Sequence, residues 1–425
     1  MQPEQTERRS AARIAQASSH RRDAGATHQG IESFGIAFSG SGGEYFRVWI
    51  VNLLLNVVTL GFYTPFARRR TAQYFYSHSL VADSPLEFTA QQRKMVFGFL
   101  LLVAIYVAFR LAADTGQDTA VSLFLLAGAA LAPYFWASAM RFRLGATRWR
   151  GVRLQFTASW GEVYKASWPM FAIALVWIVT VLAFSAFTDD VPERMASSPL
   201  PGAWPAIPPL IWALPAAALV MTLLCIIRLE FNYKSLLVSR ASIGTQAGRW
   251  KPVFGDFVRI WLATLGVFLG GALVFAVVFG AIAAGSFNAP GTKPPGLAAT
   301  IITVVATALA FLLGLVLASA PARAYRQARM FRLVWNNVGV SRIARFKCKL
   351  RAKPFVLLRV KNMLLTLFTL GFYRPFAMVS EYRMKMESVS LHVKGGVDQL
   401  VGQLVQQQGG LGDAVADAVG LDLVG

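Results

Sequence analysis

Six long apolar segments dominate the pattern of hydrophobic and polar positions. They run over 95–111, 120–140, 168–187, 210–227, 257–284 and 297–318. Each approaches or exceeds the roughly 20 residues that a helix needs to cross a hydrocarbon core. The segments fall into three pairs, because only the connectors 112–119, 188–209 and 285–296 separate the members of each pair. The pattern predicts six transmembrane helices in three hairpins.

A second pattern, with apolar and polar residues in alternation, follows the helical segments. It covers 77–90, 147–158, 234–246, 338–350 and 388–393. A period of two with a central turn predicts β-hairpins. Strand edges cannot stay unpaired in lipid, so we expect these strands to pair in the cytoplasm as a small sheet or sheets.

The two ends of the chain carry the same sequence motif. Residues 52–67 read NLLLNVVTLGFYTPFA and residues 362–377 read NMLLTLFTLGFYRPFA. Self-similarity of this kind indicates internal repeats. Counting strand-like and helical segments together gives about five units, of which the outer two have short helices.

Basic flanks make it unfavourable for the outer units to cross the bilayer. Arg68, Arg69 and Arg70 directly follow the first motif. We therefore predict two short re-entrant or interfacial helix hairpins, each with a glycine turn and a proline at the restart, namely Gly61 with Pro65 and Gly371 with Pro375. A re-entrant segment must hide its freed backbone groups. Four polar residues are candidates for those hydrogen bonds, or cap helices only: Asn52, Thr59, Asn362 and Thr369.

The membrane region is flanked by two different tails. Residues 1–33 are polar and Arg-rich, and we expect a disordered basic tail. Residues 34–394 form the predicted membrane domain. Residues 395–425 have spaced apolar positions and four Asp residues without Lys or Arg, which predicts a weakly acidic amphipathic tail.

Charge orients the predicted spans. The chain is 55% hydrophobic and 15% charged, with a formal net charge of +21. Lys and Arg number six in 141–167, five in 228–256 and ten in 321–354, against two in the three connectors together. The positive-inside rule then places the connectors in the periplasm, and the basic segments and both termini in the cytoplasm. The expected location is the bacterial inner membrane.

The same basic residues suggest a partner. Because they cluster beside apolar runs, anionic lipid is favoured over nucleic acid. The candidate headgroup contacts are Arg68, Arg69, Arg70, Lys347, Lys349 and Arg351. The simpler interpretation is that they fix topology only, and no protein partner can be named.

Carboxylates recur where three helices begin. Glu44, Glu162 and Asp256 are each followed by an aromatic and a basic residue. A carboxylate in a first turn meets unpaired N–H groups and the positive end of the helix dipole. A cation-binding role is the alternative.

The motifs that would indicate catalysis are missing from the sequence. It holds no Walker loop, HExxH, GxSxG or Rossmann fingerprint in a suitable context, and only two cysteines. We therefore expect no enzyme, metal or cofactor. An envelope scaffold or interaction protein is the first hypothesis. A transporter or channel for an uncharged or lipidic solute is the alternative, because transport folds often contain repeats.

The chain from about Phe34 to the C-terminus resembles a known family, and the stretch 38–79 carries the signature. Gly40, Gly43, Glu44, Trp49 and the TLGFY motif fall as in the YjgN-type bacterial inner-membrane family, whose domain has no known function. One departure is Thr64-Pro65-Phe66, where that family is expected to have a small residue before the proline and Trp after it. The resemblance implies a multi-pass inner-membrane protein and no particular activity.

Overall fold

The computed structural model describes residues 31–188, 212–244, 246–251, 253–287, 297–340, 343–394 and 402. Within them, six helices are long and apolar enough to cross a membrane, as the sequence predicts. They are α4 (Gln92–Asp114), α5 (Asp118–Gly145), α7 (Trp168–Thr188), α9 (Ala213–Ser239), α10 (Phe254–Phe287) and α11 (Leu297–Asn337). Only 6% to 17% of each apolar window is buried inside the protein, so these helices present apolar side chains outward.

The first and last helix pairs are shorter. α2 (Gly42–Val58) precedes α3 (Thr64–Ser77), and α12 (Ala352–Phe368) precedes α13 (Arg374–Glu387). A helix of 17 residues, such as α2 or α12, is about 25 Å long, less than the roughly 30 Å of a hydrocarbon core. A further helix of seven residues, α6 (Trp160–Ala166), lies directly before α7.

All described strands belong to one sheet. They are β1 (Ile31–Gly35), β2 (Ala37–Phe38), β3 (Ser79–Val81), β4 (Ser84–Phe88), β5 (Thr147–Trp149), β6 (Val152–Phe156), β7 (Ala241–Ile243), β8 (Gln246–Trp250), β9 (Val338–Val340), β10 (Ala344–Cys348) and β11 (Val389–Lys394). The order is β1-β11-β10-β9-β8-β7-β6-β5-β4-β3-β2. The strands pair with one another as expected, but in one 11-stranded sheet rather than in a small sheet or sheets, because the hairpins join edge to edge.

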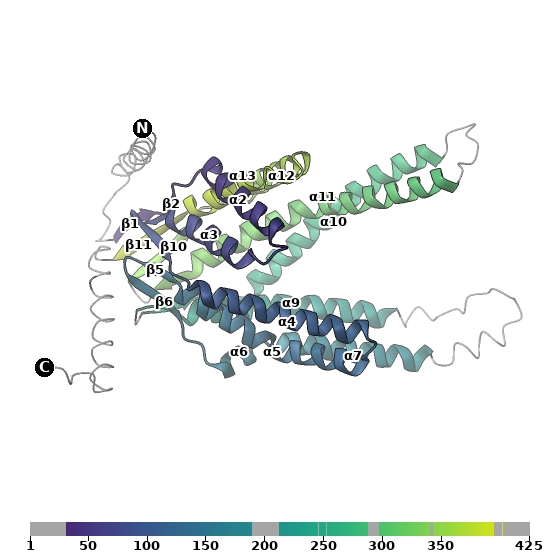
Figure 1. Ribbon diagram of the computed structural model, residues 1–425, viewed down its shortest axis with the longest axis horizontal. Coiled ribbons are helices and arrows are strands. Elements are labelled where there is room, and N and C mark those ends of the chain that lie inside the picture. Colours follow the sequence, from purple (N-terminus) through teal and green to yellow (C-terminus); the bar gives the residue numbers. More distant parts are fainter. Residues whose placement is uncertain are drawn as a thin grey trace, which may run out of the picture. The chain divides into compact units, whose positions relative to one another are not determined.

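The sheet is barrel-like because one stretch of chain supplies both of its ends. β1 pairs antiparallel with β11, from Ile31 opposite Lys394 to Gly35 opposite Ser390. Two residues later, β2 pairs with β3, with Ala37 opposite Leu80. β1 therefore begins at Ile31, within the range that the sequence analysis gave to the tail. Figure 1 shows β1, β2, β10 and β11 gathered at one end of the ribbon.

Apolar side chains pack together inside the curved sheet. Trp149, Val152, Val340, Leu391 and Val393 form one buried cluster with Ala82 and Ala344. Val152 and Val393 have no exposed surface. The sheet is thus a filled barrel with its own hydrophobic core.

Helix pairs are inserted between neighbouring strands. Along the chain, β2, β4, β6, β8 and β10 each lead into helices, and the next strand in sequence follows those helices.

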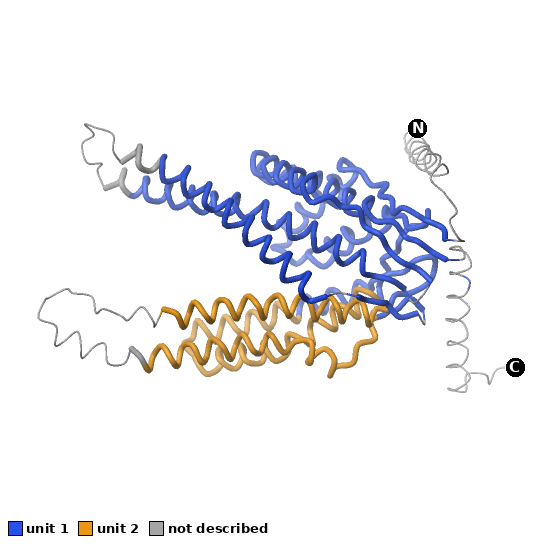
Figure 2. The backbone as a smooth tube through the Cα atoms, turned by 180° about the vertical axis from the view of Figure 1, so that it is seen from behind, with its two compact units in different colours: residues 1–100, 145–155, 242–425 blue, residues 101–144, 156–241 orange. Residues whose placement is uncertain are grey.

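The chain divides into two compact units (Figure 2). One comprises residues 1–100, 145–155 and 242–425, with nearly all of the barrel, and the other comprises 101–144 and 156–241.

Candidate functional site

Both TLGFY segments form the same tight turn between two helices. Leu60 and Gly61 have φ of +49° and +91°, and Leu370 and Gly371 have +51° and +96°. Gly61 N–H donates to the Asn56 carbonyl at 2.8 Å, and Gly371 donates in the same way to Thr366 at 2.7 Å. These bonds satisfy carbonyls left free at the end of the first helix. Leu60 and Leu370 lie in the left-handed helical region near +50°, whereas the values above +90° at Gly61 and Gly371 favour glycine because a side chain is strained there.

The threonine of each motif ties the two helices to the turn. Thr59 Oγ1 donates to the Leu55 carbonyl at 2.6 Å and accepts from the Tyr63 backbone N–H at 3.0 Å. In the last hairpin, Thr369 Oγ1 donates to the Leu365 carbonyl at 2.7 Å and accepts from the Tyr373 backbone N–H at 2.9 Å. Pro65 and Pro375 occupy the first turns of α3 and α13, where a missing N–H costs least.

A buried asparagine clasps the two helices of each hairpin. Asn52 Nδ2 donates to the Ala67 carbonyl at 3.5 Å, and Asn362 Nδ2 donates to the Ala377 carbonyl at 3.4 Å. Both side chains are almost fully buried. The four polar positions named from the sequence thus all contact backbone groups within their hairpins.

The hairpin tips are apolar and uncovered. Leu60 is 89% exposed and Leu370 is 90% exposed. Further apolar side chains around the tips are exposed as well: Leu54, Val57, Val58 and Phe62 in the first hairpin, and Leu367, Phe368 and Phe372 in the last. Contiguous apolar surface of this kind marks a contact with lipid or protein.

The two hairpins also pack on each other, although they lie at opposite ends of the chain. α2 contacts α13, and α13 in turn contacts α12; Figure 1 shows α2 and α13 next to each other. The rings of Phe46 and Phe376 stack with centroids 5.8 Å apart, and those of Trp49 and Phe372 meet edge to face at 6.3 Å. Closure of the barrel places these hairpins together.

Arginines lie directly behind the first tip. Arg68 and Arg70 on α3 are exposed, and Arg69 is half-buried. The Arg70 guanidinium lies 5.8 Å from the centroid of the Tyr63 ring. An apolar tip followed at once by cationic side chains is the arrangement of a segment that enters a membrane interface.

A basic wall covers one outer side of the barrel. We use this name for Arg249, Arg345, Lys347, Lys349 and Lys394, which are all exposed. In the sheet register Gly339 lies opposite both Arg249 and Arg345, and His392 lies opposite Arg345. Burial lowers the pKa of His392, and Lys347 and Lys349 lower it further, which reflects the positive potential at this wall.

The direction of β10 determines how far each of these basic residues lies from the helices. β10 ends at Cys348 and leads into α12, so Lys349 and Arg351 lie at the edge of the barrel from which the helices leave. Arg345, four residues before Lys349, is about 13 Å farther along the strand.

Two of the three carboxylates at helix entries cap their helices. Glu44 accepts from the Ser41 backbone N–H at 3.2 Å, and the Ser41 hydroxyl accepts from the Glu44 N–H at 3.2 Å. Glu162 forms the same capping box with Ser159. Asp256 lies in the first turn of α10. Within the described residues, no group of three His, Cys, Asp or Glu side chains is placed to hold a metal ion.

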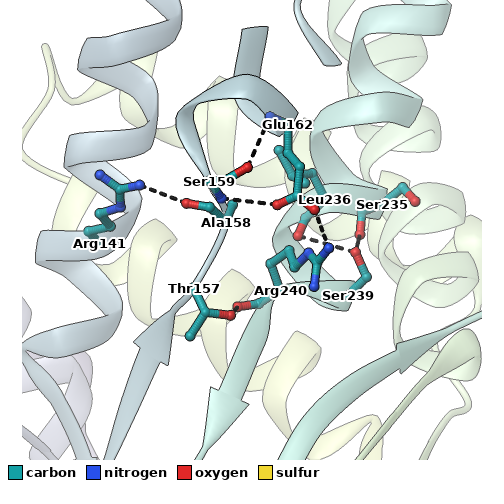
Figure 3. Close-up of polar contacts among 9 residues, drawn as sticks. All are labelled: Arg141, Thr157, Ala158, Ser159, Glu162, Ser235, Leu236, Ser239 and Arg240. Carbon is teal, nitrogen blue, oxygen red and sulfur yellow. Dashed lines mark hydrogen bonds and ion pairs between the residues drawn. The ribbon is translucent and has the colours of Figure 1, made fainter. Parts of the chain in front are cut away.

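Figure 3 shows the Glu162 entry in detail. The Glu162 carboxylate also pairs with Arg240, and the backbone bond from Ser159 and this partner both lower its pKa. Arg141 Nη2 donates to the Ala158 carbonyl at 2.7 Å, and its guanidinium lies 3.8 Å from the Trp160 ring centroid. The loop before α6 is thereby fixed to α5 and α9.

The residue directly after each entry carboxylate is buried, and the position was not predicted from the sequence. Tyr45 and Val163 are almost fully buried, as is Phe257 after Asp256. Phe355 takes this place in the last unit, where Pro354 replaces the carboxylate. Aligning the units at this position, rather than at the carboxylate, would have indicated it.

Substitution of the turn glycines tests the hairpin geometry. Gly61→Val and Gly371→Val place a β-branched side chain at strongly positive φ, which costs about 1–3 kcal/mol. We expect a lower melting temperature for both variants in detergent, measured by fluorescence-detected size exclusion. Gly98→Val in α4, where a side chain meets open space, is the control. Melting of all three variants at the wild-type temperature would contradict the turn.

Comparison with known proteins places the chain in a family. The curated relatives include the inner membrane protein YjgN of Salmonella typhimurium, 28% identical over 147 residues, which are 34% of this chain and 36% of that protein. YjgN of Escherichia coli K12 is 24% identical over 168 residues, 40% of this chain and 42% of the relative. The aligned part is thus well under half the length of these relatives. No solved structure matches. The model of the family described as bacterial protein of unknown function, DUF898, matches residues 34–418, and the chain belongs to this family.

Proposed function

We propose that this protein is a non-enzymatic scaffold of the bacterial inner membrane that holds a basic β-barrel against anionic lipid. Six helices cross the bilayer, the barrel lies in the cytoplasm, and the two terminal hairpins enter the cytoplasmic leaflet. The observation that carries the proposal is the combination of bare apolar tips with a basic wall in the same unit. YjgN relatives are named as inner membrane proteins, which agrees with this location.

Hairpin length supports entry into one leaflet. α2 and α12 are too short to span the core, yet the most exposed large apolar side chains of their hairpins are leucines at the turns. Several of the polar groups freed at each turn have a partner within the hairpin, which favours the entry of backbone into lipid. Such a segment anchors the barrel close to the headgroups.

The basic wall supports lipid contact. Lys349 and Arg351 lie at the barrel edge nearest to the helices, where headgroups would meet them. Each Lys or Arg near an anionic surface contributes about 1 kcal/mol, and the effect fades within a Debye length. Arg68, Arg69 and Arg70 on α3 add further positive charge within the same compact unit.

The filled interior of the barrel favours a scaffold over a transporter or channel. Its interior holds Trp149, Val152, Leu391 and Val393 in mutual contact, so it provides a rigid body rather than a polar passage. Transport of an uncharged or lipidic solute is the second candidate, because repeated helix pairs are common among transporters. Flux of such a solute into proteoliposomes would favour that candidate.

The orientation is tested by cysteine labelling in a variant without the native Cys225 and Cys348. Gln117→Cys lies in the connector between α4 and α5 and should react from outside in intact spheroplasts, because that connector is poor in basic residues. Glu87→Cys lies on the outer face of β4 and should react only after the membrane is opened. Reaction of Glu87→Cys alone from outside would reverse the orientation.

Removal of basic residues tests lipid binding. Replacing Lys347, Lys349 and Arg351 by glutamine should leave insertion intact, because many other cytoplasmic charges remain. Co-purified phosphatidylglycerol and cardiolipin, counted by mass spectrometry, should fall, and raised salt should produce the same loss in the wild type. The control replaces Arg110, beside Asp114 at the far end of α4, by glutamine. Unchanged lipid content in the triple variant would reduce these residues to a topological role.

A further inference from the structure

The two terminal hairpins share a backbone but differ in charge at several aligned positions. Aligning the motifs sets Asn362 on Asn52 and Ala377 on Ala67. The same alignment sets Arg359, Glu381 and Lys385 of the last hairpin on Trp49, Thr71 and Phe75 of the first. The last hairpin therefore carries three charged side chains where its counterpart carries none. Because the fold is matched without them, the shared structure does not require these charges.

Arg359 and Glu381 meet beside the asparagine clasp. Asn362 Nδ2 lies 3.0 Å from Ser380 Oγ and 3.3 Å from Glu381 Oε1, in addition to the Ala377 carbonyl. Glu381 Oε2 lies 3.8 Å from Arg359 Nε. Lys385 follows Glu381 by four residues on the same face of α13. The cluster thus joins α12 and α13, and Lys385 lies four residues before the start of β11.

The Glu381 carboxylate interacts electrostatically with both Arg359 and Lys385. Burial lowers the pKa of Lys385, Glu381 raises it, and Arg359 lowers it. A half-buried cation needs an anionic partner, because its desolvation is otherwise uncompensated. The Arg359 side chain is 35% exposed, and Lys385 is partly exposed, so a ligand can reach both cations.

We propose that Arg359 and Lys385 bind one phosphate group, carried by an anionic phospholipid headgroup or free in the cytoplasm. Arginine offers a planar pair of donors and lysine a compact charge, and both are usual partners of phosphate oxygens. Glu381 orients Arg359 and competes with the ligand for it. The lipid form of the proposal rests on the proposed insertion of the hairpin into the membrane.

Opposite effects of two substitutions separate a binding role from a structural one. Lys385→Met removes a charge-assisted contact, so phosphatidylglycerol affinity should fall roughly tenfold. Glu381→Gln keeps the size of the side chain but removes the competing anion, so affinity should rise by several fold. Lys385→Arg should restore binding. Lys361→Gln, an exposed charge two residues beyond Arg359 on α12, is the control and should bind as wild type does.

Binding is measured on the full chain in detergent by native mass spectrometry, with phosphatidylglycerol and phosphatidylcholine titrated separately. A parallel arm measures thermal protection by inorganic phosphate. Phosphatidylglycerol binding that depends on Lys385 identifies a lipid site, and protection by inorganic phosphate that depends on Lys385 identifies a site for free phosphate. Weaker binding in both Lys385→Met and Glu381→Gln, with equal loss of stability, overturns the proposal. So does wild-type binding of both ligands in Lys385→Met. The Lys385 variants can bind as wild type does while the variant at Lys347, Lys349 and Arg351 still loses lipid. That result would rule out the phosphate site and leave the proposed scaffold standing.

Discussion

The antiparallel pairing of β1 with β11 is the contact on which the rest of the structure depends. Without it the sheet would keep open edges at β2 and β11, which are templates for pairing with other chains. Residues 31–38 supply partners to both edges, since β1 pairs with β11 and β2 with β3. Closure also encloses the apolar cluster around Trp149 and Leu391, so the hydrophobic core of the barrel exists only when the sheet is curved.

Closure of the barrel brings the first and last repeats together, and the two repeats differ in their charged side chains. α2 and α13 pack through aromatic rings, and Arg383 donates to the Gly40 carbonyl at 2.6 Å. The two hairpins keep the same turn and the same asparagine clasp. Arg68, Arg69 and Arg70 belong to the first alone, whereas Arg359, Glu381 and Lys385 belong to the last alone. A shared backbone with different charges suggests one anchoring role and two different contacts with the headgroup region.

The sequence predicted the elements of this fold better than their assembly. Hydropathy and length located the six long helices, and alternation located the strands that follow them. Alternation tells which face of a strand is buried but not which strand lies beside it, so the pairing of Ile31 with Lys394 across the whole chain could not be predicted. The Arg359–Glu381 pair was missed for a similar reason. The aligned motif ends at Ala377, and the clasp that brings these residues together is visible only in three dimensions.

Closure of the barrel is tested most directly by a disulfide across its last seam. In a variant without Cys225 and Cys348, Ser33→Cys with His392→Cys places two cysteines at directly opposite positions. Such Cα atoms lie about 4.5–5.5 Å apart, within the range that a disulfide spans. The account predicts a cross-linked peptide by mass spectrometry after mild oxidation, and far less from Ser33→Cys with Ser390→Cys, which lie on a diagonal. Equal cross-linking of both pairs, or none in the first, would contradict the closed sheet.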